Sequence, residues 1–392
     1  MHGKETCKKE IAKVKCLMFG HYGGCNTGDD AMLAGMIREL TLRGASLIYV
    51  VTKDGTVPSF VTNVKAVGRS PLSILRAIRN VEAVVLGGGT HFHDDYTPRR
   101  YWWHFRYMTF IVGLSWTARV MGKRIYWLGM GFGPFHRLSA KLITRFGLKS
   151  CHGVTVRDRQ SYHEVQSWVQ TDRLCHAFDL AALLDIIGNG PTDSVMDDGQ
   201  VLGISVTSVQ ATASGGKLTD ATYWSRFVSA LGKIYSQRLS LQVRVFVFRG
   251  GNREDDKAIS HQVVKSLQAI DPDRVELVPY FDDPFKTLQA AQACSFFIAS
   301  RFHAGILAYL AGCRLLLLAY HRKVRDLASE IDLSPNACLP ISPDVSEAEV
   351  RQAIEWLLGG DPGYNAGLPV NQARERAMRS IEMMFGKYEP CD

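Results

Sequence analysis

The segment Ser-Arg-Phe-His at 300–303 brings an arginine and a histidine together directly after an apolar run at 296–299. The apolar run is predicted to be a strand, and a helix is predicted to follow it. Arg301 and His303 would then lie where the helix dipole is positive, with Ser300 at the turn. A guanidinium binds phosphate or carboxylate through paired hydrogen bonds, and a histidine there can transfer a proton, so the segment predicts a site for an anion. The alternative is structural: the arginine pairs with a carboxylate of its own domain and the histidine caps the helix.

Two further cations follow predicted strands of the same half of the chain. Lys323 ends the basic turn 320–323 after the strand predicted at 314–319, and Arg249 follows the strand predicted at 242–248. Ligands of open parallel sheets bind beyond the carboxyl ends of the strands, where neighbouring loops meet. The turn 320–323 therefore adds positive charge at the same edge of the sheet, and a solvated basic turn is the alternative there.

A glycine-rich loop at 20–30 lies between a predicted strand at 14–20 and a predicted helix at 30–42. Its glycines let the backbone approach a ligand, and the free amides at the start of the helix attract an anion or a carbonyl oxygen. Asp29 or Asp30 could cap the helix or accept a proton. A tight turn explains the loop equally well, because it contains neither a dinucleotide-binding nor a phosphate-loop pattern.

Three consecutive glycines at 87–89 follow the strand predicted at 83–86 and precede His91. Such a run lets the backbone pass close to a ligand or to a neighbouring helix. The histidines and aspartates at 91–95 are residue types that bind several metals. No second cluster with metal-ligand spacing accompanies them, so no metal site is predicted.

The elements that position these loops alternate between short apolar strands and helical patterns, which is typical of βαβ units around a parallel sheet. In the first half, strands are predicted at 14–20, 47–52, 83–86, 124–128 and 153–156, and helices at 30–42, 72–78, 101–121 and 140–146. In the second half, strands are predicted at 201–206, 242–248, 275–279, 296–299 and 314–319, and helices at 223–237, 255–269, 285–293 and 304–311. The predicted architecture is α/β, with Rossmann-like domains at 1–186 and 201–392 that face each other across a cleft and are joined by a linker at 187–200.

The composition is that of a globular protein with more than one core. The 392 residues exceed the length that a single core usually supports, and 46% of them are hydrophobic while 21% are charged. The net charge of +8 suits an anionic substrate, an acidic membrane surface or nucleic acid. Because the lysines and arginines are scattered along the sequence, no nucleic-acid partner is predicted.

The expected location is the cytoplasm. The nine cysteines are odd in number and widely spaced, which is typical of proteins that keep their thiols reduced. The first fifteen residues lack the apolar core of a signal peptide. The apolar stretch 107–120 is too short to span a bilayer and is expected to be a buried helix, with peripheral contact to the inner face of the membrane as the alternative.

In their order and spacing, these loops resemble the polysaccharide pyruvyl transferase family. The matching pieces are the glycine-rich run at 22–30, the strand and glycines at 84–89, Val-Arg-Asp at 156–158, Phe-Asp at 178–179, Ser-Arg-Phe-His at 300–303 and Tyr-X-X-Lys at 320–323. The resemblance extends over nearly the whole chain, from about residue 14 to about residue 332.

This resemblance implies a fold similar to that of the GT-B glycosyltransferases and transfer of pyruvate from phosphoenolpyruvate to sugar hydroxyls as a ketal. Such chemistry needs no metal or other cofactor. The residues implied on the donor side are Ser300, Arg301, His303, Lys323 and Arg249. The residues implied on the acceptor side are Tyr22, Asn26, Gly88, Gly89 and His91. His303 is the expected acid and Asp29 or Asp30 the expected base, and the saccharide acceptor is free, nucleotide-linked or lipid-linked.

Thr207 departs from the family, because many members carry an arginine just after the first strand of the second domain. A threonine cannot supply that charge, so either Arg249 compensates for it or the donor differs. Two other functions stay open: a GT-B-type glycosyltransferase that uses a nucleotide sugar, and a non-catalytic relative that binds a glycan or an anion.

Overall fold

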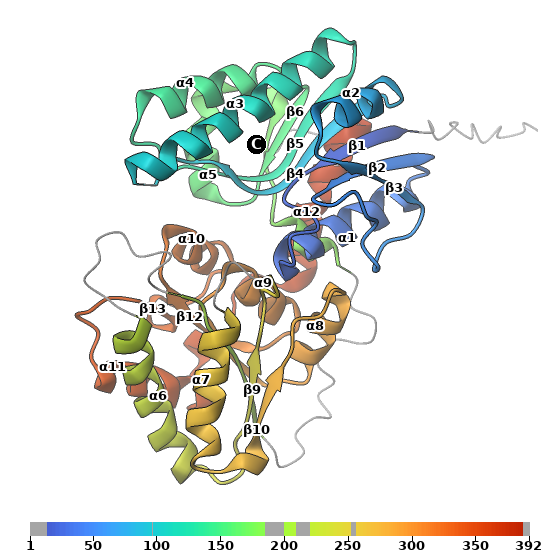
Figure 1. Ribbon diagram of the computed structural model, residues 1–392. Helices are drawn as coiled ribbons and strands as arrows, with labels where there is room; N and C mark the ends of the chain where they lie inside the picture. The colour runs from blue at the N-terminus through green and yellow to red at the C-terminus, as the bar shows by residue number, and fades with distance from the viewer. Residues whose placement is uncertain (1–13, 96, 185–199, 209–219, 252–255, 387–392) are drawn as a thin grey trace, which may run out of the picture.

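The computed structural model of the chain describes residues 14–95, 97–184, 200–208, 220–251 and 256–386. Two domains, each with a parallel sheet and helices around it, lie one above the other in Figure 1. The predicted α/β architecture of two Rossmann-like domains is confirmed. The predicted linker, 187–200, lies outside the described residues except for its last residue.

The first sheet has seven parallel strands in the order β3-β2-β1-β4-β5-β6-β7. They are β1 (Lys15–Phe19), β2 (Leu47–Thr52), β3 (Val64–Gly68), β4 (Ala83–Phe92), β5 (Arg124–Phe132), β6 (Gly153–Val156) and β7 (Leu174–His176). The helices of this domain are α1 (Thr27–Leu42), α2 (Pro71–Arg79), α3 (Pro98–Val120), α4 (Leu138–Leu148) and α5 (Arg159–Val165). Side chains alternate across the sheet: Leu17 and Phe19 belong to a core shared with α2 and α3, whereas Cys16 and Met18 belong to a core shared with α1.

The second sheet has six parallel strands in the order β10-β9-β8-β11-β12-β13. They are β8 (Val201–Ser205), β9 (Gln242–Phe246), β10 (Val275–Val278), β11 (Phe296–Ala299), β12 (Arg314–Ala319) and β13 (Cys338–Pro340). The helices are α6 (Asp220–Gln237), α7 (Asp256–Gln268), α8 (Pro284–Gln292), α9 (Phe302–Leu310), α10 (Arg322–Glu330) and α11 (Glu347–Gly359). In both sheets the strands run in one direction, so the loops that follow them gather at one edge, and these two edges face each other.

Helix α12 (Val370–Phe385) returns from the second domain and packs against strands β5 and β6 of the first sheet (Figure 1). Ser380 Oγ on this helix lies 2.7 Å from Thr155 Oγ1 on β6. The Tyr126 hydroxyl on β5 donates to the Met384 carbonyl at 3.4 Å. The segment falls within the predicted C-terminal domain, 201–392, yet it completes the core of the first domain and so ties the two domains together.

Strand β4 is longer than predicted, because it continues through the glycine run to Phe92. Gly88 and Gly89 have φ angles of +60° and +90°, and the pairing with β5 is irregular between Gly89 and Phe92. A Cβ on Gly88 would lie 2.2 Å from Met32 Sδ on α1. The glycines therefore let a neighbouring helix come close, which is one of the two explanations that the sequence allowed.

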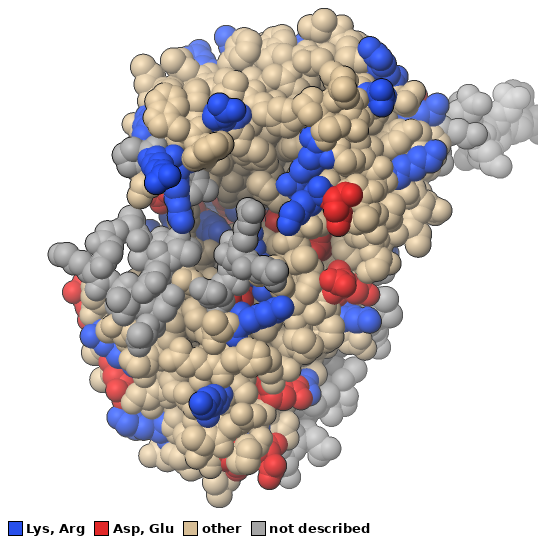
Figure 2. Space-filling view, in the orientation of Figure 1, with Lys and Arg blue, Asp and Glu red and all other residues tan. Residues whose placement is uncertain are grey.

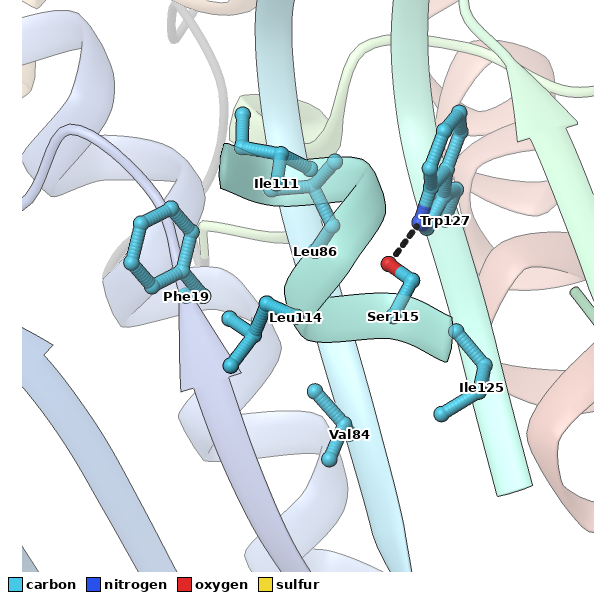
Figure 3. A pocket seen from close by; sticks show the side chains of 8 residues that line it. All are labelled: Phe19, Val84, Leu86, Ile111, Leu114, Ser115, Ile125 and Trp127. Atoms are coloured by element: carbon cyan, nitrogen blue, oxygen red, sulfur yellow. Dashed lines mark hydrogen bonds between the residues drawn. The ribbon is translucent and has the colours of Figure 1, made fainter. Parts of the chain in front are cut away.

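A small apolar cavity lies between α3 and strands β1, β4 and β5 (Figure 3). It is lined by Phe19, Val84, Leu86, Ile111, Leu114, Ser115, Ile125 and Trp127. Ser115 supplies the hydrogen-bond acceptor of this apolar region, since the indole N–H of Trp127 donates to its Oγ at 3.2 Å. Both residues are buried, so this bond satisfies a polar group that water does not reach. Among the described residues, no helix is long and apolar enough to cross a membrane.

We expect Ser115→Ala to lower the free energy of unfolding by about 1–3 kcal/mol, because it leaves the buried indole N–H of Trp127 without its acceptor. Urea denaturation measures the change. Ser225→Ala, at an exposed position on α6, is the control and should change stability little. Equal stability of the two variants would mean that the Trp127 N–H has another partner.

Candidate functional site

The N-terminal end of α1 is bonded to the second domain. The Thr27 N–H and the Thr27 hydroxyl both donate to the Phe248 carbonyl, at 3.2 and 3.1 Å. The preceding residue, Asn26, forms an isolated β-bridge with Arg249. The glycine-rich loop after β1 is thus clamped to the segment after β9, and two predicted site loops from different domains meet here.

Gly28 allows His303 of α9 to lie against the first turn of α1. A Cβ on Gly28 would lie 2.0 Å from His303 Nδ1, so a larger residue does not fit. The other ring nitrogen, Nε2, lies 3.6 Å from Asp179 Oδ2, an ion-pair distance that is too long for a hydrogen bond. Within the described part of the chain, this buried nitrogen has no hydrogen-bond partner.

Arg157 and Asp179 connect His303 to the first sheet. Arg157 follows β6 and donates from Nη1 to Asp179 Oδ2 at 3.1 Å and from Nη2 to Thr90 Oγ1 on β4 at 2.9 Å. Its guanidinium lies 4.1 Å from the centre of the Phe302 ring. The row Thr90, Arg157, Asp179 and His303 thus crosses from one domain to the other.

The one carboxylate of this row, Asp179, lies beside Arg157 and His303. Burial raises the pKa of the Asp179 carboxyl, but His303 and Arg157 outweigh burial and lower that pKa to about 2. The carboxylate therefore stays charged at neutral pH, and it faces the His303 ring. Arg157 is 4% exposed, and its Nε has no hydrogen-bond partner among the described residues.

A polar pocket opens between the two domains beside Arg157. It is lined by Thr90, Gly131, Phe132, Gly133, Arg157, Asp158 and Ser161 of the first domain and by His321, Arg322, Lys323 and Asp326 of the second. Three cationic side chains therefore stand against two carboxylates, and Arg322 Nε lies 3.3 Å from Asp326 Oδ2. Lysines and arginines are visible in the hollow between the domains in Figure 2. This composition suits a ligand with more than one negative charge.

One ion pair and one contact between a histidine and a carboxylate cross between the domains near this pocket; burial lowers the pKa of His321 to about 4, so that ring is neutral at neutral pH. Arg322 Nη1 lies 3.2 Å from Glu164 Oε1, and His321 Nε2 lies 3.4 Å from Asp95 Oδ2. The predicted ligand Lys323 begins α10 together with Arg322 and is half-buried. The basic turn that follows β12 is therefore part of the interdomain surface and not only a solvated turn.

Arg301 and Ser300 are held by their own domain. Arg301 donates from Nε and Nη2 to the two carboxylate oxygens of Asp256 at 2.5 and 2.6 Å. Asp256 is fully buried. The Ser300 hydroxyl and N–H both donate to the Ser205 carbonyl, at 2.9 and 3.0 Å. The structure thus shows for Arg301 the pairing with a domain carboxylate that the sequence offered as the alternative.

The predicted acceptor-side residues of the glycine-rich loop have structural bonds. Tyr22 is buried, and its hydroxyl donates to the Gly87 carbonyl at 3.0 Å. Asn26 caps α1: its Oδ1 accepts from the Gly28 N–H at 3.3 Å, and its Nδ2 donates to Asp29 Oδ2 at 2.5 Å. Since these contacts and the Phe248 carbonyl occupy the first amides of α1, the loop itself offers little room for an anion.

His91 lies in a hydrogen-bonded chain with two other ring side chains. Its Nε2 is 2.6 Å from the Gly88 carbonyl, its Nδ1 is 2.8 Å from the Tyr107 hydroxyl, and that hydroxyl is 3.3 Å from His21 Nε2. A carbonyl accepts only, so His91 carries its proton on Nε2, Tyr107 donates to Nδ1, and His21 donates to Tyr107. Burial holds the pKa of His91 well below its ordinary value, so the ring is neutral.

Asp29 and Asp30 differ in what they face. Asp29 bonds to Asn26 within its own loop, whereas Asp30 accepts from the hydroxyl of Tyr280, in the second domain, at 3.2 Å. Burial, and then the negative charge of Asp29, raise the pKa of Asp30 to about 7. A carboxyl with this pKa changes its protonation near neutral pH, as a general base requires.

Thr207 is buried at the end of β8, and its carbonyl accepts from Trp224 Nε1 at 3.1 Å. Arg249 lies beside Asn26 and not at the end of β8. The cation that actually stands next to the His303 and Asp179 pair is Arg157, from the opposite domain.

The sequence pointed to Arg157 and Asp179 only as parts of family motifs and gave them no role. Arg157 directly follows the strand predicted at 153–156, which was the signal that could have found it, whereas no strand was predicted before Asp179. Among the described residues, no group of histidine, cysteine, aspartate or glutamate is arranged to hold a metal ion.

This chain matches one protein family and is similar in fold to several solved structures. The family profile described as polysaccharide pyruvyl transferase matches residues 26–322. No curated protein sequence matches. Three similar solved structures are the UDP-GlcNAc 2-epimerase of Methanocaldococcus jannaschii (TM-score 0.61, 9% identity, covering 95% of this chain and 99% of that one), the UDP-GlcNAc 2-epimerase of Neisseria meningitidis bound to UDP-GlcNAc (0.59, 10%, 95% and 99%) and Anabaena HepE in complex with UDP and glucose (0.56, 11%, 95% and 97%). At these identities they establish the fold, which is the predicted GT-B-like one.

We expect Gly28→Ala to destabilise the protein by about 1–3 kcal/mol, because the new methyl group overlaps His303. Urea denaturation measures the loss. Gly113→Ala is the matched control, since it is also a helical glycine but has open space around it, and it should be neutral or stabilising. A stable Gly28→Ala variant would contradict the close packing of α1 on α9.

The raised pKa of Asp30 predicts a pH dependence of stability. The folded state binds this proton more tightly than the unfolded state, so stability falls as the pH rises from the ordinary pKa of 3.8 through about 7. Asp30→Asn should remove this contribution to the change of stability with pH. The measurement is the difference between the urea midpoints at about pH 5 and about pH 8. Asp172→Asn, at an exposed site, should keep the wild-type slope, and an unchanged slope in Asp30→Asn would refute the assignment.

Proposed function

The chain belongs to the polysaccharide pyruvyl transferase family, and from this premise we propose that it moves pyruvate from phosphoenolpyruvate onto two hydroxyls of a saccharide as a ketal. The family makes the chain a transferase of polysaccharide biosynthesis. The observation that carries the proposal is the cationic pocket between the domains, with Arg157 on one wall and Arg322 and Lys323 on the other.

Phosphoenolpyruvate carries a phosphate and a carboxylate, and the pocket offers a separate cation for each. The Nε–H of Arg157, which has no hydrogen-bond partner among the described residues, can donate to one of these groups, and the ammonium of Lys323 can neutralise the other. We assign Arg301 a positioning role at the start of α9, because two of its nitrogens already donate to Asp256. In this scheme Arg157 supplies the charge that relatives place at the position of Thr207, and Arg249 lies on the acceptor side, beside Asn26.

The proposed reaction needs a proton on the vinyl carbon of the donor. Protonated His303 gives its Nε2 proton to that carbon, and Asp179 stabilises the imidazolium before transfer. The adjacent carbon becomes an electrophile, and a sugar hydroxyl attacks it and gives up its proton. A second hydroxyl then displaces phosphate, and the proton of this second hydroxyl leaves with the phosphate. The proton of the first hydroxyl goes to the base, and it replaces over the whole cycle the proton that His303 gave to the donor. Closure of the domains excludes water, which would otherwise take the place of the sugar.

The acceptor is proposed to bind on the first domain, beside the ring cluster of His21, His91 and Tyr107. Asp30, whose pKa is raised to about 7, is the proposed base for the attacking hydroxyl, and Asp29 is the alternative. Since Tyr22, Gly88 and Gly89 are buried, they shape this wall and do not reach the acceptor themselves. The proposed location is the cytoplasm, where a lipid-linked acceptor would lie at the inner face of the membrane.

A second candidate is a transferase that uses a nucleotide sugar. It is favoured by the solved structures of similar fold that contain UDP or a UDP-sugar. The two candidates release different products, because the first liberates phosphate and the second liberates a nucleotide.

The test is to supply purified protein with phosphoenolpyruvate or UDP-sugars together with saccharide acceptors and to measure phosphate and nucleotide release. We expect acceptor-dependent phosphate release from phosphoenolpyruvate. His303→Gln should lower kcat by at least ~10²-fold, because it removes the proton donor.

His261→Gln, an exposed histidine on α7, is the matched control and should keep full activity. Lys323→Met should raise the KM for phosphoenolpyruvate. Nucleotide release without phosphate release would replace the proposal with the second candidate, and full activity of His303→Gln would refute the role of that residue.

A further inference from the structure

One stretch of the first domain contains positive charge and no negative charge. Residues 96–157 have no aspartate or glutamate, although the whole chain has 38. The same stretch contains eleven cationic residues: Arg99, Arg100, Arg106, Arg119, Lys123, Arg124, Arg137, Lys141, Arg145, Lys149 and Arg157. The cations of the chain are scattered, but this stretch is distinguished by having no acidic residue to balance them.

Helices α3 and α4 of this stretch pack side by side on the outside of the first domain (Figure 1). The Trp116 and Phe146 rings stack with their centres 5.0 Å apart, and the Trp116 N–H donates to the Phe146 carbonyl at 3.1 Å. These contacts fix the two helices as one surface, which we call the α3/α4 face.

The α3/α4 face exposes large apolar side chains that would ordinarily be buried. They are Trp102, Trp103, Phe110, Leu138, Leu142 and Phe146. Trp103 is 72% exposed and Leu138 is 70% exposed. Six exposed large apolar side chains on two helices that pack together indicate an interaction surface, since soluble monomers rarely expose so many near one another.

Exposed cations are interspersed with these apolar groups. On the two helices they are Arg99, Arg100, Arg106, Lys141 and Arg145. In Figure 2, lysines and arginines are spread over the visible side of the upper domain, whereas the acidic groups visible there lie near its junction with the lower domain. Exposed tryptophan and leucine surrounded by arginine and lysine is the composition of a surface that rests in the headgroup region of an anionic membrane.

The two sides of α3 have different neighbours. On one side, the centre of the His104 ring lies 4.6 Å from that of His93, and Tyr107 bonds to His91 near the end of β4. On the outer side, Trp103, Arg106 and Phe110 are exposed, at the helical spacing of one face.

We propose that the α3/α4 face docks the protein on the surface of a bilayer that contains anionic phospholipid. Its apolar side chains enter the interface and its cations contact the phosphates. A second copy of the chain is a poorer occupant, because a symmetric contact would bring the same unbalanced positive charges together. The inference does not depend on the donor of the proposed reaction.

The test is co-sedimentation of the full chain with vesicles of phosphatidylcholine alone or of phosphatidylcholine with phosphatidylglycerol. We expect binding to the anionic vesicles that weakens as salt is added, because exposed charges are screened. Arg100→Glu with Lys141→Glu and Arg145→Glu should lower binding at least ~10-fold, and Trp103→Ser with Leu142→Ser should do the same without changing the charge.

Matched controls lie on the second domain. Trp356→Ser changes another exposed tryptophan, and Lys257→Glu with Lys265→Glu changes exposed charges on α7, so both should bind like the wild type. Circular dichroism and phosphate release with a water-soluble acceptor should be unchanged in every variant, which separates docking from folding and from catalysis. Absence of binding to anionic vesicles, or equal loss in the control variants, would overturn the proposal, as would a dimer in solution that only the α3/α4 variants dissociate.

Discussion

The first turn of α1 is the contact on which the arrangement of the two domains depends. Thr27 donates twice to the Phe248 carbonyl, and Gly28 leaves space for His303. Neither contact tolerates much displacement, since one consists of hydrogen bonds to backbone and the other is close packing against a ring. The position of His303 relative to Asp179 and Arg157, and hence the shape of the cationic pocket, follows from this contact.

This constraint explains why the functional groups come from both domains. His303 belongs to α9, whereas Asp179 and Arg157, which set its charge environment, follow strands of the first sheet. An anion bound between the domains would add contacts that neither domain provides alone, so binding and closure would favour each other. The chemistry of phosphoenolpyruvate, with two anionic groups and a proton-dependent activation, matches such a site.

Much of the fold could be predicted from the sequence, because apolar runs such as 47–52 and 296–299 have the length and composition of buried parallel strands. Strands β3, β7 and β13 were not predicted: β7 and β13 have only three residues each, and β3 is only partly buried and contains a lysine. The start of β4 at Ala83 was predicted, but its C-terminal end was wrong for a physical reason: Gly88 and Gly89 have the composition of a loop, yet they continue the strand beside α1. Partners distant in sequence were beyond prediction, above all Asp256 for Arg301 and Asp179 for His303.

The most direct test of the proposed chemistry is the transfer reaction run in D₂O, with mass spectrometry and NMR of the saccharide product. If His303 protonates the vinyl carbon of phosphoenolpyruvate, the solvent-exchanged proton becomes part of the pyruvyl methyl group. The account predicts a ketal whose methyl group carries one deuterium. A product that carries a hexose in place of the ketal, or a ketal whose methyl group has no deuterium, would contradict it.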